Sequence, residues 1–205
     1  MLRIAFYREK TSCLGPFSRF ALWVQGCEKN CPGCIAQNHK SQDGGFLISE
    51  EEIAKLVLKQ TDNEGITISG GEPMLQAESL QKLIQLIRQE REDYGVIVYT
   101  GYTYQELVTL SKEDIHIEDF LNQIDLLIDG EYVDVLNDEC GYVGSSNQTI
   151  IALSNRYKKI INEFYEKQGR KTELVFDRDK TLLVGIPSRD TMKIWKKIKE
   201  NMENV

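Results

Sequence analysis

The sequence predicts an α/β fold with a mostly parallel sheet, because short β-rich runs alternate with helical patterns over the first two-thirds of the chain. Each β-rich run ends in a glycine, as expected where a strand enters a tight loop. The runs are residues 19–26, 65–70, 95–101 and 124–130. This alternation favours βαβ units with right-handed crossovers, and sheets of this kind carry their sites at the carboxyl ends of the strands.

The segments between these runs carry helix signals. Residues 49–60 begin with Ser49 as an N-cap, and Glu52 three residues later completes a capping box. A second helix is predicted from apolar residues that recur at helical spacing on one face. These residues are Leu80, Leu83, Ile84 and Ile87. A shorter helix is expected over residues 103–110.

The character of the sequence changes after about residue 150. We expect a charged helix from residue 155 that ends near Gly169, then a β-hairpin around residues 177–180, and a last helix over 188–203. The apolar stripe of that last helix consists of Ile194, Trp195, Ile198 and Met202. A separate domain of about 50 residues would be marginally stable. We therefore expect a core over 1–153 and a C-terminal extension over 154–205, packed on the same domain.

Composition restricts the function. The chain has 205 residues and a net charge of −7, and no run rich in Lys and Arg offsets this charge. A phosphate backbone would be repelled, which argues against a nucleic-acid or membrane-surface role. The charged first ten residues do not resemble a signal peptide, and no apolar run reaches the ~18 residues typical of a membrane span. We expect a cytoplasmic protein, whose thiols stay reduced.

Three of the five cysteines lie within eight residues, at Cys27, Cys31 and Cys34, with the spacing C-x3-C-x2-C. In the cytosol such a group indicates metal binding or redox chemistry and not a disulfide framework. Thiolates hold iron–sulfur clusters, and Pro32 and Gly33 allow one turn of backbone to bend closely around one. Three thiolates leave one iron without a protein ligand, and an open coordination position is a place for chemistry.

A zinc site is the alternative for the same cysteines. Its fourth ligand would be His39, Cys13 or Cys140. Structural zinc sites usually combine paired cysteine motifs with four clear ligands. Cys13 and Cys140 are also explained as small packed side chains, and His39 as a loop residue. The cysteines by themselves leave both metals open.

A second motif, ISGGEP, closes the run at residues 65–70. Ser69, Gly70 and Gly71 leave backbone accessible to a closely approaching ligand, and Glu72 supplies a carboxylate at the same place. The turn is not a phosphate cradle, since the pattern G-x-x-x-x-G-K-[ST] is absent and an acid would repel phosphate. A carboxylate and strand-edge carbonyls suit a cationic amino group beside an open iron.

At these two motifs the sequence resembles the radical S-adenosylmethionine (SAM) superfamily. The resemblance implies that Cys27, Cys31 and Cys34 hold a 4Fe–4S cluster whose fourth iron binds the amino and carboxylate groups of SAM. Around the methionine moiety it implies Ser69, Gly70, Gly71 and Glu72, and beside the adenine the backbone of Gly33, Cys34 and Ile35. Many members have an aromatic residue where this chain has Gly33.

The chain is similar to the activating proteins of anaerobic ribonucleotide reductase, a family of compact glycyl-radical activases. The similarity lies in four segments that occur in order: GPFSRFALWVQGCEKNCPGC, VYTGYTYQEL, IDLLIDGEYV and GSSNQ. The resemblance covers roughly residues 13–153 and implies an incomplete (β/α) barrel. It implies a SAM pocket with Tyr99, Thr100 and Gly101 at the ribose, Asp129 at the next strand, and Ser145, Ser146, Asn147 and Gln148 on the far side.

Each of these pocket residues also has a simpler interpretation. Thr100-Gly101 and Asp129-Gly130 are plausible turn residues, and GSSNQ could cap the helix expected to follow it. We favour the hypothesis that GSSNQ both caps that helix and lines the pocket. The chain also departs from the family at two places. Val143 stands where members usually have an arginine, and residues 154–205 exceed the shortest members.

The resemblance further implies a mechanism. An external one-electron donor, flavodoxin or ferredoxin, reduces the cluster. SAM is then cleaved to methionine and a 5′-deoxyadenosyl radical. This radical takes a hydrogen from a glycine Cα of the partner enzyme, here anaerobic ribonucleotide reductase. No side chain is expected to act as acid, base or nucleophile. Trp23 and Tyr102 are candidates to line the partner interface.

Two other functions remain open on the sequence. One is a radical SAM enzyme that modifies a peptide or a small molecule, with the extension shaping its substrate site. The other is a zinc-stabilised interaction module without catalysis. Colour distinguishes them, because a protein with an iron–sulfur cluster is brown and absorbs near ~400 nm.

Overall fold

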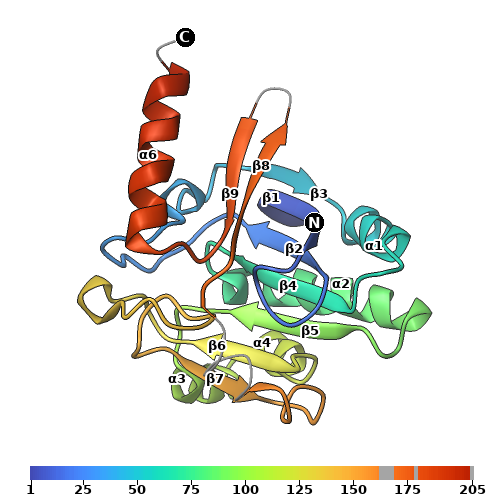
Figure 1. The fold of residues 1–205 in the computed structure, drawn as a ribbon. Coiled ribbons are helices and arrows are strands. Elements are labelled where there is room, and N and C mark those ends of the chain that lie inside the picture. Colours follow the sequence, from blue (N-terminus) through green and yellow to red (C-terminus); the bar gives the residue numbers. More distant parts are fainter. Residues whose placement is uncertain (162–168, 178–179, 204–205) are drawn as a thin grey trace.

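The computed structural model describes residues 1–161, 169–177 and 180–203 (Figure 1). The described strands are β1 (Leu2–Thr11), β2 (Arg19–Val24), β3 (Phe46–Ile48), β4 (Gly65–Gly70), β5 (Gly95–Tyr99), β6 (Leu126–Asp129), β7 (Thr149–Ala152), β8 (Thr172–Asp177) and β9 (Lys180–Gly185). The described helices are α1 (Glu50–Lys59), α2 (Ala77–Glu90), α3 (Tyr104–Leu110), α4 (Ile115–Leu121) and α6 (Arg189–Glu203). Short 3-10 turns lie at η1 (Gln37–His39), η2 (Pro73–Gln76) and η3 (Asp134–Leu136).

One sheet of seven strands runs in the order β3-β1-β2-β4-β5-β6-β7 (Figure 1). Its centre is parallel, because β2, β4, β5 and β6 pair in the same direction. These are the four strands that the sequence predicts, so the α/β prediction with a mostly parallel sheet is confirmed. The edges are antiparallel: β1 and β3 extend one side, and β7 extends the other.

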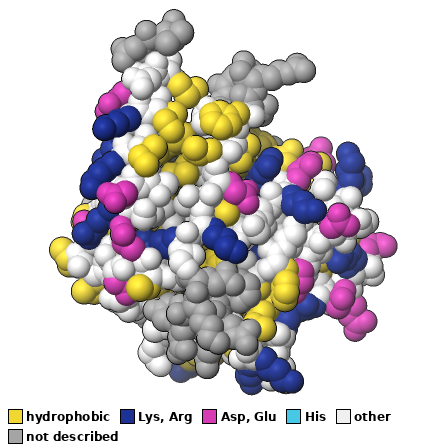
Figure 2. Space-filling view, in the orientation of Figure 1, with side chains coloured by type: hydrophobic (Ala, Val, Ile, Leu, Met, Phe, Trp, Pro, Cys, Tyr) yellow, Lys and Arg dark blue, Asp and Glu magenta, His cyan; other side chains and the backbone are white. Residues whose placement is uncertain are grey.

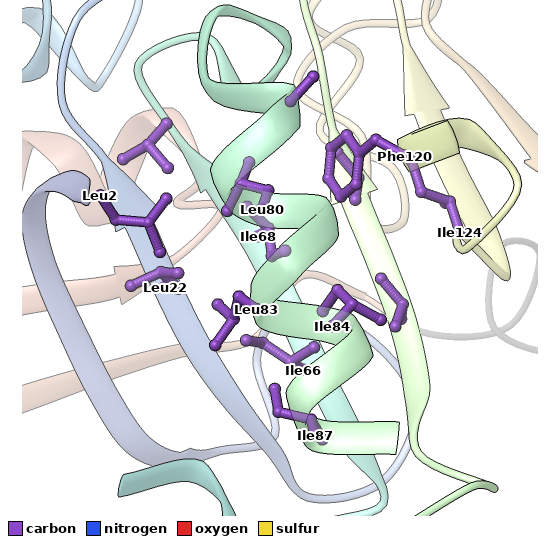
Figure 3. Packing of buried hydrophobic residues seen from close by; sticks show 14 of the residues in the cluster. Leu2, Leu22, Ile66, Ile68, Leu80, Leu83, Ile84, Ile87, Phe120 and Ile124 are labelled. Atoms are coloured by element: carbon purple, nitrogen blue, oxygen red, sulfur yellow. The ribbon is translucent and has the colours of Figure 1, made fainter. Parts of the chain in front are cut away.

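Helices cover one face of the sheet. The capping box of α1 forms as predicted, with the Ser49 hydroxyl accepting from the Glu52 amide at 3.1 Å. The predicted apolar face of α2 packs on β4 and on the neighbouring strands, with α4 beside it (Figure 3). The cluster includes Leu2, Leu22, Ile66, Ile68, Leu80, Leu83, Ile84, Ile87, Phe120 and Ile124. Parallel strands between two covered faces explain why these runs are almost continuously apolar.

The C-terminal part of the chain covers the opposite face. The predicted hairpin forms as β8 and β9, and Val175 and Val184 pack against Leu14, Ala21 and Trp23. A second cluster on this face joins β5 and β6 to the segment after β7. Its buried members are Ile97, Leu126, Ile128, Val143 and Tyr157. The extension therefore buries side chains of the same sheet that the helices cover from behind.

A buried guanidinium closes the amino ends of the central strands. Arg19 is fully buried, and its Nε donates to Thr67 Oγ1 at 2.8 Å. Its other nitrogens bind the Glu64 carboxylate, the Tyr157 hydroxyl at 2.9 Å, and the carbonyls of Ile66 and Gly95 at 2.9 and 3.1 Å. A buried charge is tolerated when every donor has a partner, as here.

One predicted element is corrected. The charged helix expected from residue 155 to near Gly169 does not form at its start, because residues 155–160 are bends and turns. Residues 162–168 lie outside the described part of the chain. The local reason lies in Tyr157, whose buried hydroxyl bonds Arg19 and Glu64 and holds this stretch against the sheet. The last helix forms as predicted, as α6. Within the described residues, no helix is both long and apolar enough to span a bilayer.

Candidate functional site

The three clustered cysteines lie on one loop that follows β2 at the carboxyl end of the sheet. Gly26 opens this loop with a φ of 98°, which only glycine adopts readily. The loop returns to its start, since the Gly26 amide donates to the His39 carbonyl at 2.8 Å and the Cys27 amide to the Lys40 carbonyl at 3.1 Å. Backbone hydrogen bonds therefore close the loop around the cysteines.

Cys27, Cys31 and Cys34 are free thiols on this one loop. Cys34 interacts electrostatically with both of the others. Burial raises the pKa of Cys27 and of Cys31, and the nearby carboxylates of Glu72 and Glu131 raise them further. Metal ligation requires thiolates. Since the protein environment disfavours the thiolate form, the bound metal must itself stabilise it.

Of the three candidates for a fourth zinc ligand, Cys13 and Cys140 lie outside the cluster loop and His39 lies on it. Cys13 is buried beside Glu173 and Gly185 of the extension, and burial raises the pKa of its thiol to about 11. Cys140 is exposed, and its amide donates to Asp138 at 3.0 Å. His39 lies on the cluster loop with its Nδ1 buried and without a hydrogen-bond partner in the described structure. Burial lowers the pKa of this imidazole.

The two glycines of the SGGE turn allow the backbone of β4 to touch the start of the cluster loop. A Cβ on Gly71 would lie 2.1 Å from the carbonyl oxygen of Gly26, and one on Gly70 would lie 2.5 Å from that of Val24. The amides of Gly71 and Glu72 donate to those carbonyls, Val24 and Gly26, at 2.8 Å each. No other residue type fits, so the motif seats the cluster loop on the end of β4.

Glu72 joins the ends of β4 and β5. Its carboxylate is 1% exposed and accepts three hydrogen bonds, from the Met74 amide at 3.0 Å, the Thr100 hydroxyl at 2.7 Å and the Gly101 amide at 2.8 Å. Burial raises the pKa of this carboxyl, and Lys29 opposes the rise. The sequence indicates this residue, but the three protein donors appear only in the structure.

Tyr99 and Asp129 are also tied into the protein. The Tyr99 hydroxyl donates to the Tyr142 carbonyl at 3.0 Å, and burial raises its pKa. Asp129 accepts from the Tyr104 amide at 2.6 Å, at the start of α3, and from the Thr149 amide at 3.2 Å, at the start of β7. Asp129 therefore connects three elements at the carboxyl edge of the sheet.

The GSSNQ segment packs on the turn after β6. The Ser145 hydroxyl accepts from the Val133 amide at 3.1 Å, and the Ser146 amide donates to the Leu136 carbonyl at 2.8 Å. The side-chain amides of Asn147 and Gln148 donate to the carbonyls of Glu131 and Gly130 at 2.8 and 2.7 Å. The alternative role as a helix cap is wrong, because β7 begins directly after Gln148.

A guanidinium does reach the loop at Val143, where the family usually has an arginine. It comes from Arg170 in the extension, which donates to the Val143 carbonyl at 2.8 Å, the Gly144 carbonyl at 3.0 Å and the Pro187 carbonyl at 3.2 Å. Sequence reasoning missed this residue, because nothing in the local pattern relates Arg170 to the loop it binds.

Comparison with known proteins identifies the family. Residues 13–151 match the model described as a 4Fe-4S single cluster domain. The chain belongs to this family. It is 34% identical over 143 residues to the anaerobic ribonucleoside-triphosphate reductase-activating protein of Vibrio cholerae, which covers 66% of this chain and 88% of the relative. Similarity to the protein of the same name from Escherichia coli K12 is 32% over 143 residues, covering 66% and 89%.

A relative with a different printed name supports the same class. The pyruvate formate-lyase-activating enzyme of Clostridium pasteurianum is 30% identical over 126 residues, which is 58% of this chain and 48% of that relative. Together with the 4Fe-4S family, these relatives show that the chain is a radical SAM enzyme of the activase class. Its cofactors are a 4Fe–4S cluster and SAM.

The residues of the cysteine loop are suited to hold a 4Fe–4S cluster. The donor set is three thiols on one short loop, and Gly33 within it has a φ of 78°, so the chain turns sharply between the second and third cysteines. Within the described residues, no three His, Cys, Asp or Glu side chains converge closely enough to hold a single metal ion. In a cluster each cysteine binds a different iron, so such convergence is not required.

Sequence reasoning missed Lys29, which lies within the cluster loop, and Glu131, which lies beside it. Lys29, between the first two cysteines, forms an ion pair with Glu131 at 3.2 Å, and its Nζ lies 4.1 Å from the centre of the Tyr102 ring. Glu131 in turn lies 3.7 Å from the Cys31 sulfur. The sequence shows Lys29 as a cation inside the cysteine motif, but its partner Glu131 lies far away along the chain.

The remaining predicted residues occupy different places. Ile35 is 54% exposed next to Cys34, on the outer side of the loop. Tyr102 lies under Lys29 at the carboxyl end of β5. Trp23 is half-buried between the hairpin and the Phe6 ring, whose centre lies 5.4 Å from that of the indole.

Proposed function

We propose that this chain installs a glycyl radical on a partner enzyme, and that the partner is an anaerobic ribonucleotide reductase. The observation that supports this proposal most is the match of residues 13–151 to a single-cluster 4Fe-4S family whose curated relatives carry reductase-activating names. The local geometry agrees, because three free thiols lie on a loop seated directly on the SGGE turn.

In this proposal Cys27, Cys31 and Cys34 hold the cluster, and the carboxyl ends of β2, β4, β5 and β6 form the SAM pocket. The proposed SAM contacts are Gly33, Cys34, Ile35, Ser69, Gly70, Gly71, Glu72, Tyr99, Thr100, Asp129, Ser145, Ser146 and Asn147. When bound, the cluster and SAM supply a one-electron cleavage that leads to removal of a hydrogen atom from the partner's glycine.

The chain's own residues position these cofactors. Glu72 holds the ends of β4 and β5 together through three hydrogen bonds, which leaves neighbouring backbone groups fixed toward the pocket. The glycine pair keeps the cluster loop against β4. Asp129 and the GSSNQ segment brace the opposite side of the pocket through hydrogen bonds to the turn after β6. We assign no acid, base or nucleophile.

We further propose that residues 1–153 form an incomplete (β/α) barrel of the radical SAM type, with residues 154–205 as an extension of the same domain. Four parallel strands with helices on their outer face support the barrel. Packing of Val175 and Val184 on Ala21 supports the single domain. We propose a cytoplasmic flavodoxin or ferredoxin as the electron donor.

Electron spin resonance tests the proposed function. The chain, reconstituted anaerobically with iron and sulfide, is reduced and mixed with SAM and an anaerobic ribonucleotide reductase. We expect a brown protein, a cluster signal that SAM perturbs, and a radical doublet that moves to the partner's glycine. The Cys34→Ser variant serves as control and should give neither cluster nor doublet, since one iron loses its thiolate.

Two results would contradict parts of this proposal. SAM cleavage without a radical on any reductase would favour the alternative in which a peptide or small molecule is the substrate. A cluster signal that SAM leaves unchanged would contradict the SAM pocket itself.

A further inference from the structure

Helix α6 carries most of its charge as cations, in a chain whose net charge is −7. Its first eleven residues contain five basic side chains and one acidic side chain, Asp190, which pairs with Lys193 at 2.8 Å. The basic residues are Arg189, Lys193, Lys196, Lys197 and Lys199. Lys193, Lys196 and Lys197 are exposed and lie on one face of the helix at the spacing i, i+3, i+4. On the outer side of α6, Figure 2 shows dark blue side chains interspersed with magenta ones.

The apolar side of α6 is turned toward the β8–β9 hairpin. The Thr181 hydroxyl of β9 donates to the Met202 sulfur at 3.5 Å, and Trp195 and Ile198 are half-buried. Figure 2 shows apolar side chains gathered between the helix and the hairpin. The lysines lie away from this half-buried side of α6, while Ile194 and Met202 of the apolar stripe remain exposed.

The amino end of α6 lies next to the cluster loop. The Arg189 amide donates to Glu139 at 2.5 Å, and its guanidinium donates to the Asp134 carbonyl at 3.0 Å. Asp134 in turn borders Gly33, because a Cβ on that glycine would lie 3.4 Å from the Asp134 side chain. One residue thus separates the basic helix from the backbone between Cys31 and Cys34, and the loop beyond is open at the 54% exposed Ile35.

We propose that the lysine face of α6 is the docking surface for a negatively charged protein that delivers the electron to the cluster. This inference rests on the proposed function, which requires an external one-electron donor. Electron transfer needs a close approach to the cluster, and the exposed edge of the loop beside α6 offers it. Redox encounters use small interfaces, and complementary charge mainly raises their association rate.

The position of the helix favours a protein donor over an anionic membrane. An amphipathic helix binds a membrane by inserting its apolar side; on α6, Trp195 and Ile198 are half-buried, while Ile194 and Met202 are 59% and 52% exposed. A protein donor is favoured by the amino end of α6, which borders the cluster loop through Arg189 and Asp134, so that an acidic donor attracted to the helix is brought close to the cluster.

The test compares two charge-matched triple variants of the full chain. The first, Lys193→Glu/Lys196→Glu/Lys197→Glu, reverses the α6 face. The second, Lys55→Glu/Lys59→Glu/Lys112→Glu, changes the same total charge at exposed lysines on α1 and after α3. SAM cleavage is measured with dithionite and, separately, with a reduced acidic flavodoxin. Affinity for oxidised flavodoxin is measured by calorimetric titration of the same proteins.

We expect equal dithionite-driven cleavage in the wild type and both variants. With flavodoxin at limiting concentration and low salt, the α6 variant should be slower by about tenfold or more, which is the lower range of electrostatic steering. Its affinity for flavodoxin should fall, and added salt should slow the wild type more than the α6 variant. The second variant should behave nearly as the wild type.

Equal flavodoxin-driven rates and affinities in the two variants would overturn the proposal. So would an α6 variant whose only loss is binding to phosphatidylserine vesicles, since that result would assign the helix to a membrane. Failure of the proposed function looks different: the wild type would bind flavodoxin through α6 and yet cleave no SAM with dithionite.

Discussion

Glu72 illustrates what one residue contributes to the site. The motif ISGGEP indicates a carboxylate at the end of a strand, and the structure adds that this carboxylate already accepts three protein hydrogen bonds. Sequence reasoning identified the residue because the glycines beside it are unusual in a strand. It could not identify Thr100 and Gly101 as donors, because they follow a different strand and only the fold brings them near.

The Glu72→Gln variant tests these hydrogen bonds. An amide has one acceptor oxygen, so one buried donor loses its partner and the free energy of unfolding should fall by about 1–3 kcal/mol. Burial raises the pKa of Glu72 above its ordinary value of 4.5, so the folded chain binds the proton more tightly than the unfolded chain. The stability that Glu72 contributes should therefore be present below pH 4.5 and be lost as pH rises through and above that value, whereas the variant lacks this pH-dependent contribution.

Urea unfolding of the cofactor-free proteins across this pH range measures both effects. The loss caused by the substitution should be largest at the acid end and shrink as the pH rises. A difference in stability that does not change with pH would contradict the raised pKa.

Lys29 should tune the cluster. Its ammonium group pairs with Glu131, whose carboxylate lies beside the Cys31 sulfur. In Lys29→Met the cation is lost and Glu131 is left without its counter-charge. Both changes disfavour adding an electron, so we expect a more negative reduction potential, with Lys29→Arg restoring most of it.

A redox titration followed by electron spin resonance checks this expectation. Lys82→Met is the matched control, since Lys82 forms a 3.0 Å ion pair with Glu51 between two helices. If both methionine variants keep the wild-type potential, Lys29 has no electrostatic role at the cluster.

At the scale of elements, the junction between β4 and the cluster loop decides the geometry of the site. The central strands were predictable because they are buried on both faces and read as continuous apolar runs. β1 and β7 were missed, because both have exposed or half-exposed positions and therefore mixed patterns; β7 is an edge strand, and β1 has only the three-residue β3 on its outer side. β3 was missed for its length of three residues.

A single methyl group at Gly71 should separate the two parts of this junction. In Gly71→Ala the added Cβ would meet the Gly26 carbonyl oxygen at 2.1 Å, so the cluster loop must move away from β4. Overpacking of this kind costs about 1–3 kcal/mol. We expect lower stability and a lower iron content after reconstitution, both measured on the purified protein.

Gly169→Ala is the control for that experiment, since nothing lies within 4 Å of its added Cβ. It should reconstitute like the wild type. A Gly71→Ala variant with full iron content would show that the cluster loop does not depend on this contact.

For the whole molecule, the extension completes the packing of the sheet. Tyr157 bonds the buried Arg19, and Val175 and Val184 cover β2. The sequence indicated the hairpin and the last helix through their own patterns, and these formed. It could not indicate the Arg19–Tyr157 contact, because neither residue belongs to a motif and their partners depend on the folded topology.

Truncation tests this dependence. A chain ending at residue 153 loses Tyr157 and the hairpin, and should be less stable by at least about 3 kcal/mol, because burial of one large apolar side chain contributes about 1.5–3 kcal/mol. A chain ending at residue 187 keeps both and lacks only α6. We expect it to unfold cooperatively, as followed by circular dichroism in urea. Equal stability of the two truncated chains would contradict a structural role for the hairpin.

Arg170 couples the motions of the two segments that it binds. Its guanidinium donates to the carbonyls of Val143 and Gly144 on one side and to that of Pro187 on the other. One side chain therefore links the GSSNQ loop to the segment before α6. A change that reduces the motion of the GSSNQ loop should therefore also reduce the motion of the segment before α6. Amide hydrogen exchange at the start of α6 should accordingly slow when SAM binds.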